Sequence, residues 1–156
     1  DVLVFLDADT IVMPNLLKII KENFRDKKVV AASFPILPST YSNLEMIGCW
    51  LFNEVMIRGL IRMKMPIFAG ICFACRKDAF EKIGGFNEDI KVVEDIEFSS
   101  RLRKIKGKYL FLTDTIVIAS TRRHKKWSWL KIINAWPLGY LRLKLGRKLP
   151  PYRPVR

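Results

Sequence analysis

Apolar and polar residues follow one another along the chain in short blocks, whose lengths predict strands and helices in turn. An apolar run over residues 2–6, bounded by acids, has the length of a strand buried on both faces of a parallel sheet. A proline in the first turn and apolar residues at helical spacing predict a helix from Pro14 to residues 26–28. The run over 29–34 predicts a second strand, and the prolines and hydroxyl side chains of 35–42 predict a loop.

The rest of the chain continues this alternation. Residues 44–65 predict a long, half-buried helix, because Glu54, Arg58 and Arg62 form one charged stripe along it. The pattern then predicts a strand over residues 66–75, helices over 78–83 and 94–105, and strands over 109–113 and 115–120. Strands that alternate with helices indicate an α/β fold. No uncharged apolar stretch has the roughly twenty residues that a transmembrane helix needs.

Composition limits the class of protein. Half of the 156 residues are hydrophobic, enough for one domain with a sizeable core. Because the chain starts at Asp1 with a predicted interior strand, we expect it to lack amino-terminal βα units. Cys49, Cys72 and Cys75 are too few for a disulfide framework and lie in apolar runs, which favours buried thiols in a reducing compartment. Cys72 and Cys75 have C-x-x-C spacing, but residues three apart on a strand point to opposite faces, which argues against zinc or redox chemistry.

Positive charge is concentrated at the end of the chain. The net charge is +13, and residues 115–156 contain eleven Lys and Arg and no Asp or Glu. Such a block can contact anionic lipid, nucleic acid or a phosphorylated substrate. Three tryptophans and two tyrosines lie among these cations from Trp127 onward, a composition typical of a segment in a lipid interface. We therefore expect contact with an anionic membrane surface.

Two acids, Asp7 and Asp9, directly follow the first predicted strand. Alternation along a strand points both to the same side, so two hard oxygen donors can converge on Mg²⁺ or Mn²⁺. Ligands of such sheets bind at the carboxyl ends of the strands. The alternative is that the two acids simply begin a solvated loop.

A second acidic segment follows a pair of glycines. Gly84 and Gly85 permit a turn with positive φ that lays backbone beside a ligand. Glu94 and Asp95 open the next predicted helix, where the helix dipole favours an ionised carboxylate that can serve as a base. Helix capping by Asp95 is the structural alternative. Gly70, inside a predicted strand, marks a place where a ligand or another backbone segment comes close.

Together these segments resemble the family-2 glycosyltransferases of the GT-A fold. Four pieces match in order: Asp7-Ala8-Asp9 as the D-x-D, Gly70 on the acceptor-side strand, the G-G-F-x-E turn at 84–88, and the pair Glu94-Asp95. The resemblance implies a Rossmann-like mixed sheet flanked by helices. It divides the chain into a partial catalytic domain, residues 1–126, and a membrane-interfacial segment, residues 127–156. The nucleotide-contacting units of the family precede the D-x-D, so one hypothesis is that this fragment alone is inactive.

The resemblance also implies an activity and assigns roles. It implies metal-dependent, inverting transfer of a sugar from a nucleotide-diphosphate donor to a glycan hydroxyl or a lipid-linked acceptor. Asp9 would ligate Mn²⁺ or Mg²⁺, and Asp7 would contact the metal or the sugar nucleotide. Asp95 would be the general base that takes the proton of the acceptor hydroxyl, and Glu94 would orient the acceptor. The three motif glycines would line the substrate site.

A third segment, residues 120–127, follows the last predicted strand. In the resembled family a histidine here completes the metal shell, which makes His124 a candidate ligand; the alternative is a solvated histidine in a basic loop. The sequence R-x-x-K-W resembles a relaxed Q-x-x-R-W motif, and the two replacements argue against a processive role. Arg122 and Arg123 can hold phosphate oxygens, and Trp127 can stack on an acceptor sugar or face the membrane.

Two alternatives remain open. A haloacid-dehalogenase-like phosphatase would use Asp7 as nucleophile and Asp9 as acid/base, but Ile11 stands where that family has Thr or Val. A non-catalytic basic module for nucleic acid or membrane explains the end of the chain and leaves the acids without a task. We therefore expect no nucleic-acid partner, and a cytoplasmic location, peripheral on the inner face of the cell membrane.

Overall fold

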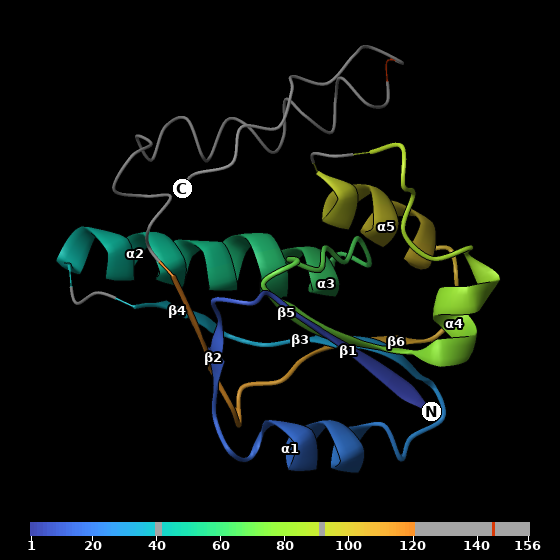
Figure 1. The fold of residues 1–156 in the computed structure, drawn as a ribbon, viewed down its shortest axis with the longest axis horizontal. Coiled ribbons are helices and arrows are strands. Elements are labelled where there is room, and N and C mark those ends of the chain that lie inside the picture. The colour runs from blue at the N-terminus through green and yellow to red at the C-terminus, as the bar shows by residue number, and fades with distance from the viewer. Residues whose placement is uncertain (40–41, 91–92, 121–144, 146–156) are drawn as a thin grey trace.

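The computed structural model describes residues 1–39, 42–90, 93–120 and 145. Its centre is a mixed sheet with the strand order β1-β5-β3-β6 (Figure 1). These strands are β1 Val2–Leu6, β5 Cys72–Arg76, β3 Val29–Ser33 and β6 Lys108–Phe111. Strand β5 pairs antiparallel with both β1 and β3, whereas β3 and β6 are parallel.

A second, smaller sheet has the order β2-β7-β4. Its strands are β2 Ile11–Val12, β7 Val117–Ala119 and β4 Ile36–Pro38. The sequence pattern placed β4 in a loop because of its prolines, and that prediction was wrong. Within the part of the chain that the structure describes, strand β4 lies at the edge of its sheet and pairs only with β7, and an edge strand tolerates residues that lack a backbone N–H.

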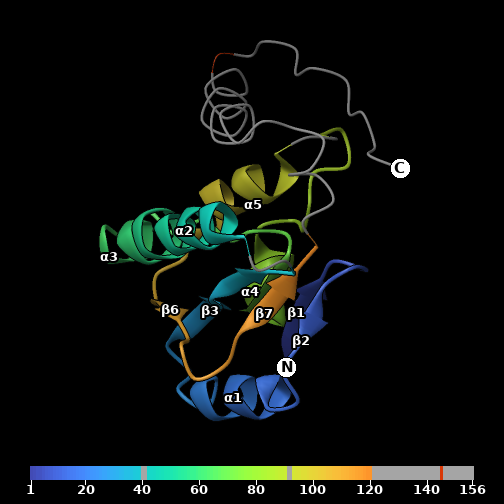
Figure 2. The same cartoon turned by 90° about the vertical axis from the view of Figure 1, so that its left-hand side faces the viewer.

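Helices flank these sheets on two sides. They are α1 Leu16–Asn23, α2 Asn43–Leu51, the π-helix η1 Phe52–Gly59, α3 Leu60–Arg62, α4 Lys77–Lys82 and α5 Glu94–Leu102. Figures 1 and 2 agree that α1 lies on one side of the sheets and that α2, α3 and α5 lie on the other. Mixed sheets flanked by helices confirm the predicted fold class.

Two strands differ from their predictions in ways that matter for the site. Strand β1 is not buried in a parallel sheet: among the described strands it lies at an edge and pairs only with β5, and Val4 and Leu6 are 37% and 47% exposed. The strand predicted over 66–75 begins only at Cys72. Upstream of it, the backbone N–H groups of Phe68 and Gly70 bond to side chains of α5 instead of a neighbouring strand.

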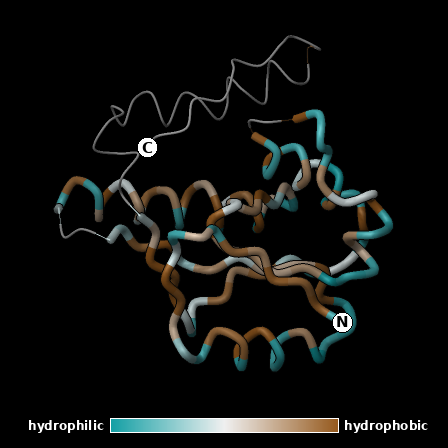
Figure 3. Tube along the Cα trace, viewed as in Figure 1, coloured by the Kyte–Doolittle hydropathy of each residue, from teal (hydrophilic) through white to brown (hydrophobic). Residues whose placement is uncertain are grey.

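The core consists of two apolar clusters. One contains Phe5, Phe73, Phe80, Phe86 and Phe98, whose rings pack against one another and hold α4 and α5 on the sheet. The other is formed with α1 and η1, and Figure 3 shows the hydrophobic strands between the helices. The three cysteines are buried and free, and Cys72 and Cys75 belong to different clusters, as predicted for opposite strand faces. Burial raises the pKa of both thiols to about 12, which keeps them unreactive.

Candidate active site

One turn of the backbone contacts both acidic segments. The N–H of Gly70 donates to Oδ2 of Asp95 at 3.1 Å. The next residue, Ile71, accepts a hydrogen bond at its carbonyl oxygen from the N–H of Asp7, also at 3.1 Å. The two acidic segments, remote in sequence, therefore lie on either side of a single dipeptide just before β5.

The D-x-D segment is an exposed turn. Strand β1 ends at Leu6, and the N–H of Thr10 donates to the carbonyl oxygen of Asp7 at 3.1 Å, which closes the turn. Asp7 and Asp9 therefore do not continue the strand alternation from which their common orientation was predicted. Both acids are exposed to solvent.

This donor set suits a hard cation only in part. Exposed carboxylates supply the oxygen ligands that Mg²⁺ and Mn²⁺ prefer, at no burial cost when no cation is bound. Within residues 1–39, 42–90 and 93–120, no three His, Cys, Asp or Glu side chains gather into a metal-binding group. A cation at Asp7 and Asp9 would thus take its other ligands from phosphate, from water or from residues outside these ranges.

Asp95 lies in a different environment. Burial raises the pKa of its carboxyl group to about 6, and the charge of neighbouring Glu94 adds to the rise. The N–H groups of Gly70 and Ile96 oppose it, because they donate to Oδ2 and Oδ1 and favour the charged form. The carboxyl group is therefore ionised at neutral pH. Its pKa lies only slightly below the near-neutral value that suits a general base.

The backbone that leads into α5 is strained. Val93, the residue before the helix, has φ +59°, in the left-handed region that a β-branched residue rarely adopts. Such a conformation costs about 1–3 kcal/mol and is typical of functional sites. Because Val93 occupies the N-cap position, Asp95 is the second helical residue, and its Oδ2 bonds outside the helix. Capping alone therefore does not account for Asp95.

Sequence analysis missed Ser99, which links the start of α5 to the segment that precedes β5. Its hydroxyl accepts a hydrogen bond from the N–H of Phe68 at 2.9 Å and donates to the carbonyl oxygen of Asp95 at 2.6 Å. The residue is 1% exposed. A serine four residues after Asp95, on the apolar face of the helix, was the available signal, since a buried hydroxyl requires a partner.

The Gly84–Gly85 turn has the predicted backbone. Its residues have φ +78° and +67°, and a side chain at Gly85 would come within 3.1 Å of the Phe80 ring. Arg101 on α5 donates to the carbonyl oxygen of Ile83 at 2.6 Å, which ties the turn to that helix. Substrate binding by Gly84, Gly85 and the exposed Glu94 stays a prediction.

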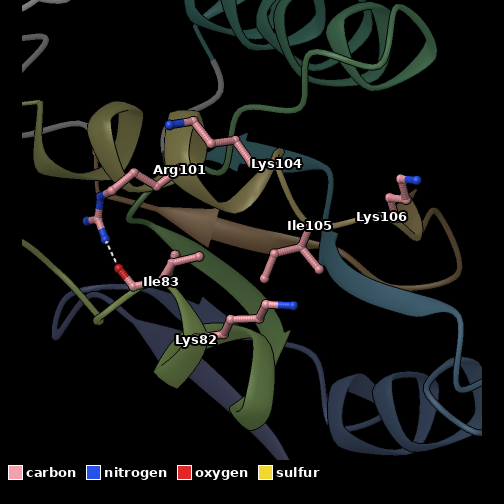
Figure 4. Close-up of a pocket in the computed structure, with 6 residues that line it drawn as sticks. All are labelled: Lys82, Ile83, Arg101, Lys104, Ile105 and Lys106. Carbon is pink, nitrogen blue, oxygen red and sulfur yellow. Dashed lines mark hydrogen bonds between the residues drawn. The ribbon is translucent and has the colours of Figure 1, made fainter.

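A cavity of about 510 Å³ lies away from the acidic segments, at the carboxyl ends of α4 and α5 (Figure 4). It is lined by Lys82, Ile83, Arg101, Lys104, Ile105 and Lys106. Arg101 is held by Glu97 through hydrogen bonds of 2.6 and 2.7 Å. Cations at helix carboxyl ends complement the helix dipole, which accounts for them without a ligand.

Four predicted site residues come from the segment that follows β7. Arg122, Arg123, His124 and Trp127 lie outside the described residues. Their roles in phosphate binding, metal ligation and acceptor stacking stay predictions.

The sequence matches the model of a known protein family. The model of a family described as glycosyl transferase family group 2 matches residues 2–153. This range contains both acidic segments and the Gly70–Ile71 turn between them. No curated protein matches the chain.

Proposed function

The chain belongs to glycosyl transferase family group 2 and is a glycosyltransferase, and from this premise we propose a metal-dependent, inverting mechanism. Family membership implies a nucleotide-sugar donor and an acceptor. We propose a nucleotide-diphosphate donor and, as acceptor, the hydroxyl of a glycan or a lipid phosphate, in glycan or glycolipid synthesis. The observation that carries the proposal is the Gly70–Ile71 turn, which bonds to Asp95 on one side and to Asp7 on the other.

Asp95 is the proposed general base. Its Oδ2 takes the proton of the acceptor hydroxyl while that oxygen forms a bond to the anomeric carbon of the donor. The bond from the anomeric carbon to the diphosphate breaks on the opposite face, so the configuration inverts. Gly70 leaves room at Oδ2, because the nearest atoms to a Cβ built at this position are Oδ2 and Cβ of Asp95, at 3.8 and 3.9 Å.

Asp7 and Asp9 are the proposed metal-binding residues, and His124 is proposed as a further ligand from the sequence. A bound Mn²⁺ or Mg²⁺ supplies neutralisation of the charge on the leaving diphosphate. The two aspartates would determine where the cation, and with it the diphosphate, binds. The hydrogen bond from the N–H of Asp7 to the carbonyl oxygen of Ile71 fixes the start of their turn relative to Gly70. In this proposal the donor phosphates bind on the Asp7 side of the dipeptide and the acceptor hydroxyl binds at Asp95.

The two alternatives are less well supported. A phosphatase of the haloacid-dehalogenase type needs its later acids at the end of a strand, whereas Glu94 and Asp95 begin helix α5. A nucleic-acid module leaves the half-buried Asp95 and the strained backbone at Val93 before it without a purpose. Membership of a glycosyltransferase family also favours transfer over both.

We also propose that residues 127–156 hold the enzyme on an anionic cytoplasmic leaflet. Support comes from composition: residues 121–156 contain eleven Lys and Arg and no acid. Attraction of this kind is screened by salt. Sedimentation with phosphatidylglycerol vesicles should therefore be strong at low salt and should weaken as salt rises.

The activity test uses the protein in the longest form that its gene encodes. It is incubated with Mn²⁺ and each of a panel of nucleotide sugars, and release of the nucleoside diphosphate is measured with and without candidate acceptors. We expect acceptor-dependent release from one donor, and loss of that release when the cation is chelated. Release that persists with chelator would contradict metal dependence, and no release from any donor would contradict the proposal.

A further inference from the structure

Exposed apolar side chains are concentrated on one helix. Eight of the thirteen exposed large hydrophobic residues in the described part of the chain lie between residues 44 and 65. Six of them lie on α2 and η1, and the five most exposed of these, at 47–66%, are Leu44, Ile47, Trp50, Leu51 and Val55. We name these five the α2 apolar face. Figure 3 shows the hydrophobic positions that recur along this helix.

The opposite side of the same helix packs on the protein. Asn53 is buried and clamps the edge strand β4, since its side chain donates to the carbonyl oxygen of Ile36 at 2.8 Å and accepts from the N–H of Ile36 at 2.9 Å. Cys49 and Ile57, one helical turn to either side, are also buried. At about 100° per residue, Leu44, Ile47 and Leu51 lie on the side opposite Asn53. Along α2 the helix is therefore apolar on its inner and outer sides alike, whereas the outer side of η1 also carries the ion pair of Glu54 and Arg58.

We propose that the α2 apolar face is a docking surface for an anionic phospholipid bilayer, with the helix lying in the plane of the interface. A contiguous exposed apolar patch marks a partner site in a soluble domain. No helix in the described residues is long and apolar enough to cross a membrane. A helix with one apolar side free, and with an exposed tryptophan on it, matches the composition of in-plane interfacial helices.

Charge favours a bilayer over the chain's own carboxyl-terminal segment as the occupant. Residues 1–120 contain 17 Lys and Arg against 15 Asp and Glu, whereas residues 121–156 contain eleven and none. The body of the protein thus has no acidic excess to balance that segment. An anionic bilayer supplies both an apolar phase for the face and counter-charge for the segment.

The end of β7 lies next to the residues that precede α2. The N–H of Ser39 donates to the carbonyl oxygen of Ala119 at 2.9 Å, so the chain leaves β7 next to the segment that leads into α2. The described stretch that contains β7 thus ends at Ser120 close to the segment that precedes α2, and the basic residues follow it in the sequence.

The first test separates this inference from the proposed attachment through residues 127–156, on which it rests. The variant Ile47→Ser/Leu51→Ser/Val55→Ser is compared with Leu17→Ser, a matched change at a 68% exposed leucine of α1 on the other side of the sheets. With mixed phosphatidylglycerol–phosphatidylcholine vesicles at high salt, the triple variant should bind at least about tenfold more weakly than wild type, because apolar contact survives screening. Leu17→Ser should bind like wild type.

The second test reports contact directly. A nitroxide is attached at Val55→Cys or Leu17→Cys, while the native Cys49, Cys72 and Cys75 are buried. On adding vesicles, the label at position 55 should become protected from a water-soluble relaxation agent and accessible to oxygen, and the label at 17 should not change.

Each other outcome overturns the inference. A label at 55 that is immobile with and without vesicles places the carboxyl-terminal segment on the face. A dimer mass in solution that the triple variant abolishes places a second copy there. If the wild-type protein does not bind the vesicles even at low salt, membrane attachment as a whole is refuted. Sugar transfer to a soluble acceptor is measured separately and tests the proposed chemistry.

Discussion

The two acidic segments of the site use the same functional group in opposite environments. Asp7 and Asp9 stand exposed to solvent on a turn after an edge strand. Asp95 begins a helix behind a strained residue and is buried enough to raise its pKa to about 6. The dipeptide Gly70–Ile71 joins the two settings.

This difference shows how one cleft can divide two tasks between carboxylates. A group that holds a cation gains from being charged at every physiological pH and from remaining open to phosphate and water. A group that accepts a proton gains from a pKa near neutrality, which requires removal from water. The comparison makes Asp95 the residue whose replacement should separate activity from stability most clearly.

Asp95→Asn should have the largest effect. Loss of the general base should lower kcat/KM by about 10³-fold. At pH 7 the same change should raise the free energy of unfolding, by at most about 3 kcal/mol, because it removes a buried charge whose pKa lies about two units above its ordinary value. Activity and urea unfolding at pH 7 are the measurements.

The matched control for this change is Glu94→Gln. Glu94 is exposed, so its replacement should alter the free energy of unfolding far less than Asp95→Asn does. A variant Asp95→Asn with full activity would remove this residue from the mechanism. One that is less stable than wild type would show that its two hydrogen bonds outweigh the cost of burial.

Asp9→Asn should have the next largest effect, of a different kind. Loss of one metal-binding oxygen should lower kcat/KM by about 10²-fold at a fixed, low Mn²⁺ concentration. Added Mn²⁺ should recover part of the activity, because the defect lies in metal affinity. Titration of activity with Mn²⁺ measures this recovery. Asp95→Asn is the control, because added Mn²⁺ should not restore its activity. An unchanged metal requirement in Asp9→Asn would leave Asp9 without the proposed role.

The pH dependence should distinguish the base from the metal-binding turn. As pH falls below about 6, Asp95 takes up a proton, and kcat/KM should fall about tenfold per unit. Stability should move the opposite way: between about pH 4, near the ordinary carboxyl pKa, and pH 6 the folded protein retains the proton that the unfolded chain has lost. The free energy of unfolding should therefore decrease as pH rises through this window.

Asp95→Asn is the control for that slope. The variant lacks the titrating group, so its free energy of unfolding should lose this part of the pH dependence. Urea unfolding of both proteins between pH 4 and 7 measures the difference. Equal slopes in the two proteins would show that Asp95 titrates normally.

Much of the fold followed from the sequence because its elements have local causes. The apolar run of β3, the proline ahead of α1 and the two glycines after α4 each specify structure through their own neighbours. Pairing between strands has no such local cause. The apolar run of β1 was therefore assigned to the interior of a parallel sheet, although it forms an edge.

The site shows the same division. The residue types at Asp7, Asp9 and Asp95 predicted a division of roles, but nothing near them in sequence specifies the bond between Gly70 and Asp95 or the left-handed backbone at Val93. Gly70 was expected inside a strand. It lies in a turn because its N–H bonds to a carboxylate from a helix that the chain reaches only later.

Gly70→Ala should have the smallest effect. It tests the Gly70–Ile71 dipeptide, which contacts both Asp95 and Asp7. A Cβ built at this position lies 3.8 Å from Oδ2 of Asp95, an ordinary van der Waals distance that the fold can accept. The methyl group would nevertheless fill space at the oxygen that receives the proton. It would also displace water there and raise the pKa of Asp95 further. We expect kcat/KM to fall by about tenfold or less, and the acid limb of the pH profile to move upward.

Gly59→Ala is the control, because its Cβ would meet only the Glu54 backbone oxygen, at 3.3 Å, within η1. Its acid limb should stay in place. If Gly70→Ala and Gly59→Ala have the same pH profile, then Oδ2 is not the proton acceptor, and its bond to Gly70 serves the fold alone. If the pH profile of Gly70→Ala moves and that of Gly59→Ala does not, then glycine is required at position 70 because a side chain there would occupy the space in which the acceptor hydroxyl approaches Asp95.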